Sequence, residues 1–311
     1  MCSQRDTTNP TLFSPTEGME YLSQNFDRLP RYLFRVQSTR SMGEITPTFV
    51  SSGHFVASRC VSMVDVLQMT KEQASDRIGA HLTWTKHLSD FVSWTSSFPF
   101  AVQMAFYKTI GKHDWEDEDR STIRIYILDT HNIPRGSILP VVPLLNFYKV
   151  EYPNLKHYEY YAAEYLSQGF LDLTGSPMTT FTLGAMIKHN FLALESDFED
   201  PKVCRQLASR LQDIRPAFNE ALPGYKPQAS TEKDLDIVCS IALNCCQDPA
   251  MRPVLMAALL SFYPRNRKDE HILGALRRSG WGKDHHFWYA RFLLIRDDRS
   301  LRHDRYAGKP S

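Results

Sequence analysis

The sequence lacks the motifs that would assign it to a common enzyme class. It has no P-loop, no dinucleotide-binding GxGxxG, no GxSxG nucleophile motif and no HExxH zinc motif. Its histidines are scattered, and the adjacent His285 and His286 do not have the i, i+4 spacing that presents two ligands on one helix face. We therefore expect no metal site.

Cysteines are few and irregularly spaced. The six cysteines include no CxxC pair, which favours reduced thiols in a reducing compartment. The first residues, MCSQRDTTNP, lack the apolar stretch of a signal peptide, and the apolar segment PVLMAALLSFY (253–263) is too short to span a bilayer. These absences predict a cytoplasmic or nuclear protein with no membrane partner.

A strong excess of charge is also missing. The net charge of +1 gives no general electrostatic argument for binding nucleic acid or membrane. Residues 264–311 are an exception, because they contain twelve Lys and Arg against six Asp and Glu. A solvated helical face is the simplest interpretation of this region, and nucleic-acid binding is a weaker alternative.

Composition and periodicity predict three parts. Residues 1–27, rich in Ser, Thr, Asn and Pro, are predicted to be a flexible arm. Residues 28–200 combine strand-like and helix-like segments, and residues 201–311 contain helix-like segments punctuated by Pro and Gly. The boundary falls near residues 200–230, with LPGYKPQAST (222–231) as the connector. We expect an α+β domain followed by a helical C-terminal domain.

Individual segments follow from the spacing of apolar residues. Residues 160–173 fit a strand or a helix, and residues 39–60 are loop-like. Strands are predicted at 31–38, 90–96 and 122–130, and helices at 64–88, 99–110, 202–214, 232–246, 253–263 and 270–278.

Hydroxyl side chains crowd the segment FVSWTSSFPF (91–100), where a strand is predicted to pass into a helix. A hydroxyl buried without a partner costs about 1–3 kcal/mol, so the fold or a ligand must use these groups. Ser96 or Ser97 before Pro99 would make a good helix start. The same hydroxyls can also face a cleft, so both uses stay open.

Three separated segments share an order of residue types that resembles a known family. They are LFRV (33–36), FVSWTSS (91–97) and YYAAEYLSQG (160–169). The order of Arg, Ser/Thr and Glu resembles the mono-ADP-ribosyltransferase superfamily in its cholera-toxin-like branch. Residues 31–173 also resemble an uncharacterised fungal domain family that shares LFRV, FVSWTSS and EYLSQG and brings no established activity. The first resemblance implies a split, two-sheet α+β core that grips NAD between its sheets.

The resemblance also implies roles for single residues. Glu164 would stabilise the positive charge that develops on the ribose when the nicotinamide bond breaks, as carboxylates do in glycoside cleavage. Arg35 would bind phosphate or ribose oxygens through its planar guanidinium. Ser93, Thr95 and Ser96 would orient the Arg and the Glu. The family's Ser-Thr-Ser triad includes Thr95 in its middle if Trp94 is an insertion, and otherwise reads 93–95 or 95–97.

One position departs from the pattern of family members that modify arginine. Those proteins carry a second acid two positions before the catalytic Glu, where this chain has Ala162. The resemblance therefore implies an ADP-ribosyltransferase with another protein acceptor, or an NAD glycohydrolase that uses water. The alternative is a non-catalytic protein-interaction module on the same fold.

Overall fold

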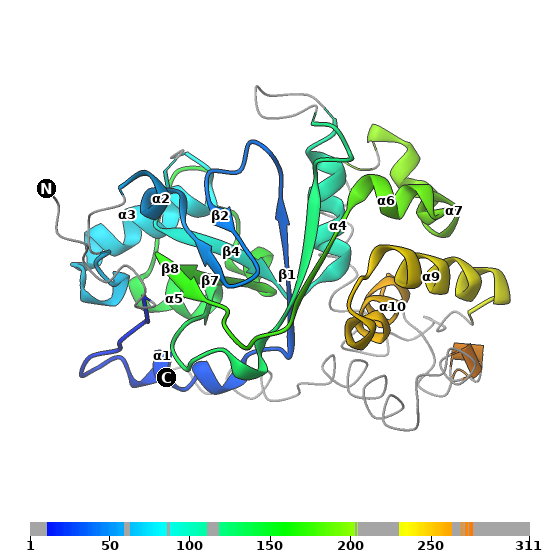
Figure 1. Ribbon diagram of the computed structural model, residues 1–311. Helices are drawn as coiled ribbons and strands as arrows, with labels where there is room; N and C mark the ends of the chain where they lie inside the picture. Colours follow the sequence, from blue (N-terminus) through cyan, green and yellow to red (C-terminus); the bar gives the residue numbers. More distant parts are fainter. Residues whose placement is uncertain are drawn as a thin grey trace, which may run out of the picture. The chain divides into compact units, whose positions relative to one another are not determined.

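The computed structural model describes residues 11–58, 63–85, 88–110, 118–202 and 230–262, with a few single residues besides (Figure 1). The chain folds into two compact units. Unit 1 comprises residues 1–97 and 111–180, and unit 2 comprises residues 98–110 and 181–311. The chain therefore leaves unit 1 after residue 97 and returns to it at residue 111.

Unit 1 is built on a six-stranded sheet in the order β6-β7-β4-β1-β5-β9. Neighbouring strands pair antiparallel from β6 through β5. The strands that contain the three candidate segments, β1, β4 and β7, are thus adjacent (Figure 1). The six strands are β1 (Tyr32–Gln37), β4 (Phe91–Thr95), β5 (Arg124–Asp129), β6 (Leu139–Pro140), β7 (Glu164–Gln168) and β9 (Met178–Thr182).

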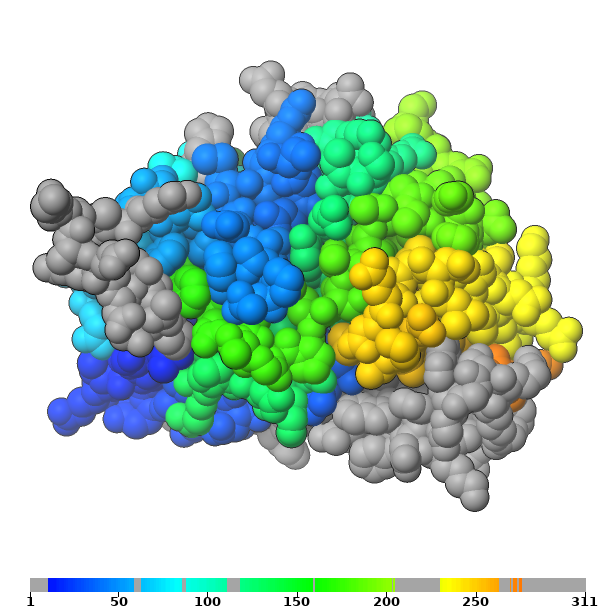
Figure 2. Space-filling model, viewed as in Figure 1, coloured from blue at the N-terminus to red at the C-terminus, as the bar shows by residue number. Residues whose placement is uncertain are grey.

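A second, three-stranded sheet of unit 1 has the order β2-β3-β8. It consists of β2 (Glu44–Ile45), β3 (Phe49–Ser51) and β8 (Phe170–Asp172), and its pairs are antiparallel. The blue surface of β3 and the green surface of β8 lie side by side in Figure 2. The predicted α+β class is confirmed, with two antiparallel sheets.

One face of the six-stranded sheet packs on helices, and we call it the helix face. Phe91 and Leu166 of the sheet join a core with α3 (Lys71–Leu82) and α5 (Val141–Tyr148). Leu166 is fully buried, and burial of such a side chain stabilises the fold by about 1.5–3 kcal/mol. This face anchors α3 above β4 and β7.

The opposite face packs on the three-stranded sheet, and we call it the inter-sheet face. Here Leu33 and Trp94 belong to the same buried cluster as Val50 and Leu171. The Trp94 indole N–H donates to Ser167 Oγ at 3.0 Å, so its polar atom is satisfied inside the core. Trp94 is therefore a core residue between the two sheets.

Several predicted elements agree with the structure. Strands β1, β4 and β5 fall within the segments predicted as strands, and α4 (Phe98–Tyr107) overlaps the helix predicted at 99–110. The open segment 160–173 contains two strands, β7 and β8. Gly169 separates them with a φ of +53°, a conformation that favours glycine.

Other predictions from composition are wrong. Residues 39–58 contain β2, β3 and α2 (Gly53–Ala57) in place of a loop, because strands of two or three residues show too little alternation to be recognised. The described part of the N-terminal arm is ordered: it contains α1 (Glu20–Ser23), and Phe13 is buried. The helix predicted from residue 64 begins at Lys71, after the short 3-10 helix η2 (Val66–Gln68).

Unit 2 contains helices around a cluster of aromatic rings. The rings of Phe98 and Phe106 on α4 pack against Phe191, Phe198 and Phe262. The described helices are α4, α6 (Leu183–Lys188), α7 (Phe191–Leu194), α9 (Glu232–Cys245) and α10 (Arg252–Leu260). α9 and α10 agree with two predicted helices. Most residues of the predicted segments 202–214, 222–231, 264–311 and 270–278 lie outside the described residues.

Gly79 on α3 lies directly against Tyr152. A β-carbon at this position would come within 2.4 Å of the Tyr152 side chain. We expect Gly79→Ala to lower the free energy of unfolding by about 1–3 kcal/mol, although alanine favours helices, because the added carbon overpacks the core. Urea denaturation measures this change. The control Ser75→Ala on the same helix should stay within about 0.5 kcal/mol, and an equally stable Gly79→Ala would contradict the packing.

Candidate functional site

Arg35 lies where strand β1 separates from β4. The register from Tyr32 to Gln37 is continuous between β1 and β5, whereas β1 and β4 share the single pair Phe34–Thr95. Beyond that pair, Arg35 Nη1 donates to the Ser93 carbonyl at 2.9 Å. The Arg35 side chain thus satisfies a β4 carbonyl beyond the last paired residues of the two strands. It links β1 to β4 where they separate.

The charge of Arg35 is not balanced by an ion pair with any described residue. Burial lowers the pKa of its guanidinium to about 10, and Tyr126 opposes this only in part. Its Nε is buried and has no hydrogen-bond partner among the described residues. A buried cation without a counter-charge is costly, so this guanidinium is suited to an anionic ligand.

Three residues beside Arg35 were not singled out by the sequence. A β-carbon on Gly43 would lie 2.5 Å from the Ser51 carbonyl oxygen and 3.6 Å from Arg35 Nη2. Gln37 donates its amide to the Gly43 carbonyl at 2.9 Å. Gln37 Oε1 and Ser51 Oγ are buried without partners in the part of the chain that the structure describes. The absence of a side chain at Gly43 therefore lets the Ser51 backbone and the Arg35 guanidinium approach it closely.

Ser93 is also held from the helix face, by a half-buried histidine. His81 on α3 contacts Ser93 Oγ through Nε2 and Ser89 Oγ through Nδ1, both at 2.7 Å. Burial and the nearby charge of Arg35 lower the pKa of His81 to about 4, while Asp90 raises it slightly. A neutral imidazole donates from one nitrogen and accepts at the other, so His81 can hold both hydroxyls.

Thr95 is the last residue of β4, and Ser96 directly follows the strand. Thr95 Oγ1 accepts the backbone N–H of Ser97 at 3.1 Å, and the Ser96 N–H donates to the Ala163 carbonyl at 2.9 Å. These bonds lie between the end of β4 and the start of α4 at Phe98. They also fix the end of β4 against the beginning of β7.

Glu164 is the first residue of β7 and is paired directly with Thr95. It is half-buried. Burial and then the carboxylate of Glu164 raise the pKa of Tyr161, although a hydrogen bond at Lys156 lowers it. Ala162 lies in the turn before the strand, so the position two residues before Glu164 is not on the extended segment.

The strand register separates Arg35 from Glu164. Directly paired residues share a face, so Phe34, Thr95 and Glu164 lie on one face, and Arg35, next to Phe34, starts from the other. Ser93 alternates with Trp94 and shares the helix face with Thr95. Arg35 and Glu164 leave opposite faces, two strands or about 10 Å apart.

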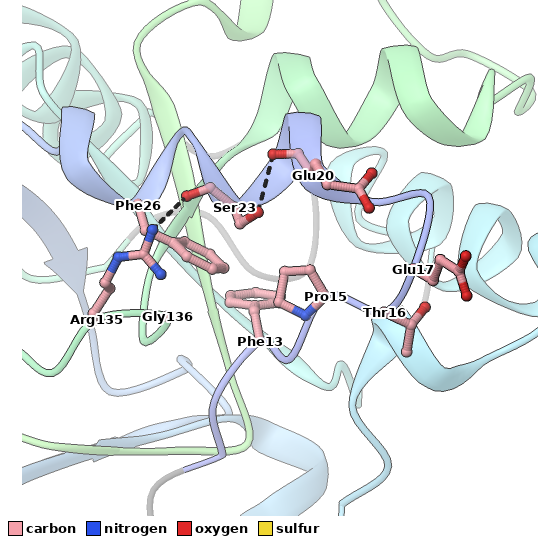
Figure 3. A pocket seen from close by; sticks show the side chains of 9 residues that line it. All are labelled: Phe13, Pro15, Thr16, Glu17, Glu20, Ser23, Phe26, Arg135 and Gly136. Carbon is pink, nitrogen blue, oxygen red and sulfur yellow. Dashed lines mark hydrogen bonds between the residues drawn. The ribbon is translucent and has the colours of Figure 1, made fainter.

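The described part of unit 1 also contains an open cavity of about 440 Å³ that includes none of the candidate residues (Figure 3). Phe13 and Phe26 line it, with Glu20 pointing to its open side. Arg135 on its wall is paired with Asp27 at 2.9 Å. The charge of this arginine is thus already balanced.

Two further features are absent from the described residues. No group of three or more His, Cys, Asp or Glu side chains is placed to hold a metal ion. In the same part of the chain, no helix combines the length and apolar character needed to cross a bilayer.

Comparison with known proteins gives one family. Residues 28–172 match a domain family described as a domain of unknown function, DUF7587. The match covers almost the same stretch as the resemblance noted above for residues 31–173. No curated protein and no solved structure gives a significant match. The comparison therefore outlines a domain and assigns it no activity.

The half-buried His81 makes the stability of the protein depend on pH. Its folded-state pKa is about 4 against an ordinary value of 6.5. Its neutral form therefore stabilises the fold above pH 6.5, and this contribution is lost as the pH falls toward 4, by up to about 3 kcal/mol. We expect His81→Gln to lose less stability than the wild type between pH 7 and pH 4.5, measured by urea denaturation. The control His131→Gln should follow the wild type, and parallel curves for all three proteins would contradict a half-buried, neutral His81.

Proposed function

We propose that unit 1 is an ADP-ribosyltransferase-like domain that binds NAD and cleaves its nicotinamide–ribose bond, as a mono-ADP-ribosyltransferase or an NAD glycohydrolase. The observation that supports it best is Arg35, a guanidinium without a described counter-charge at the opening between β1 and β4. A pyrophosphate supplies the missing negative charge, and the fork of N–H donors on Arg suits its oxygens. The proposed place of action is the cytoplasm or the nucleus.

Each candidate residue has a distinct part in this proposal. Arg35 anchors the dinucleotide, and Ser93 holds Arg35 through its carbonyl. Glu164 supplies the carboxylate that stabilises the positive charge on the ribose as the bond to nicotinamide breaks. Thr95 lies directly opposite Glu164, and Ser96 fixes the adjoining turn. Because Ala162 takes the place of the second acid, the acceptor is water or a protein side chain other than arginine.

The strand register favours a second candidate function. Arg35 and Glu164 start from opposite faces of the sheet, and an uncleaved ligand needs Arg35 alone. In this second candidate the domain is a non-catalytic module on the same fold, which binds a dinucleotide or a protein partner. NAD binding and nicotinamide release are separate measurements, so they distinguish the two candidates.

The proposal predicts different effects for the two charged residues. NAD binding, measured by calorimetry, should weaken at least about tenfold in Arg35→Gln and partly recover in Arg35→Lys, since a buried charge–phosphate contact contributes about 1.5–3 kcal/mol. Nicotinamide release should fall by about a hundredfold or more in Glu164→Gln, with NAD binding retained.

Matched controls use exposed charged residues in the first turn of α3, at the opposite end of the helix from His81. Lys71→Gln and Glu72→Gln should leave both measurements unchanged. Binding without nicotinamide release would reject the enzyme and support the module. Absence of NAD binding by the wild-type protein would reject the dinucleotide in both candidates.

A further inference from the structure

Asp90, just before β4, contacts two basic side chains from different elements. Its Oδ1 contacts Nδ1 of His54 on α2, and its Oδ2 accepts from Nη1 of Arg77 on α3. Asp90 is 7% exposed, whereas the side chains of His54 and Arg77 are 37% and 40% exposed. A buried carboxylate thus holds an imidazole and a guanidinium side by side at the surface.

Backbone hydrogen bonds fix this arrangement. The His54 N–H donates to the Ser89 carbonyl at 3.0 Å, and the Asp90 carbonyl accepts the Gly169 N–H at 2.8 Å. Ser52 caps α2 by accepting the Phe55 N–H at 3.2 Å. The two basic side chains are therefore positioned in advance, which reduces the entropy lost when a ligand binds.

A structural link between α2, α3 and β4 accounts for the inner nitrogens of the pair. It does not account for the outer ones. Nε2 of His54, and Nε and Nη2 of Arg77, make no hydrogen bond to any residue that the structure describes. Arginine presents its N–H groups in one plane, and an imidazole nitrogen can donate to a ligand oxygen or accept from a protonated one. The outer side of the pair therefore offers hydrogen-bonding groups that no described residue uses.

We propose that His54 and Arg77 form a binding site for the phosphate group of a small phosphate monoester. The charge of Arg77 offsets that of Asp90, and a phosphate supplies several oxygens for the outer nitrogens of the two basic side chains. The carboxylate of Asp90 keeps the pair in place and is itself too buried to repel the ligand directly.

This site does not depend on the proposed NAD chemistry. It uses neither Arg35 nor Glu164, and Asp90 lies three strand residues, about 10 Å, from Ser93. Binding of phosphate and binding of NAD can therefore succeed or fail independently.

Proton NMR of the His54 ring tests the site directly. The signal is assigned by its loss in His54→Gln, and the full chain is titrated with sodium phosphate against sodium chloride at equal ionic strength. Saturable shifts of the His54 signal that occur with phosphate and not with chloride are expected. Methyl phosphate should bind as inorganic phosphate does, because the outer donors need the phosphate oxygens alone.

Variants separate the site from general charge effects. Calorimetry with methyl phosphate should show affinity at least about tenfold weaker in Arg77→Gln and in His54→Gln, each of which leaves Asp90 one basic partner. The controls Arg124→Gln and His131→Gln should bind as the wild type does. An unmoved His54 signal, equal binding by all variants, or binding of inorganic phosphate without methyl phosphate would overturn the proposal.

Discussion

The separation of β1 from β4 is the constraint on which the candidate site depends. If the two strands paired along their whole length, the Ser93 carbonyl would accept from the β1 backbone and Arg35 would have no acceptor there. Because the ladder stops at Phe34 and Thr95, a guanidinium enters the sheet and ties its two halves. Gly43 completes this arrangement, since a β-carbon there would collide with the Ser51 carbonyl. Local loss of strand pairing thus makes room for the Arg35 guanidinium, which has no counter-charge among the described residues.

Strand β4 supports two different environments at once. Trp94 faces the core between the sheets, with its indole N–H satisfied by Ser167. On the other face, His81 holds Ser93, and the residues just before the strand supply Ser89 and Asp90 to partners on α2 and α3. Strand alternation explains how such polar and apolar contacts alternate along a few residues. The hydroxyl-rich segment therefore serves the fold at several positions, whatever ligand the domain binds.

The sequence predicted the longer strands correctly, because their alternation of residue types can be recognised. Strands of five or six residues such as β1, β4 and β5 show clear alternation, whereas β2 and β3 are too short to do so. The faces of Arg35 and Glu164 depend on the register between three strands, which a single sequence does not contain. His81 and His54 could not be recognised either, because their partners lie at positions 89, 90 and 93 and become neighbours only when α2 and α3 fold onto β4.

The path of the chain through α4 has a consequence for any attempt to isolate the matched domain. Residues 28–172 include α4, yet the rings against which Phe98 and Phe106 pack come from positions 191, 198 and 262. Truncation of the chain at residue 172 would remove the aromatic neighbours of these phenylalanines. The apolar side chains of α4 would then be exposed to water. The segment shared with the family is therefore not a self-sufficient folding unit in this chain, and a soluble fragment would need either the downstream helices or polar replacements along α4.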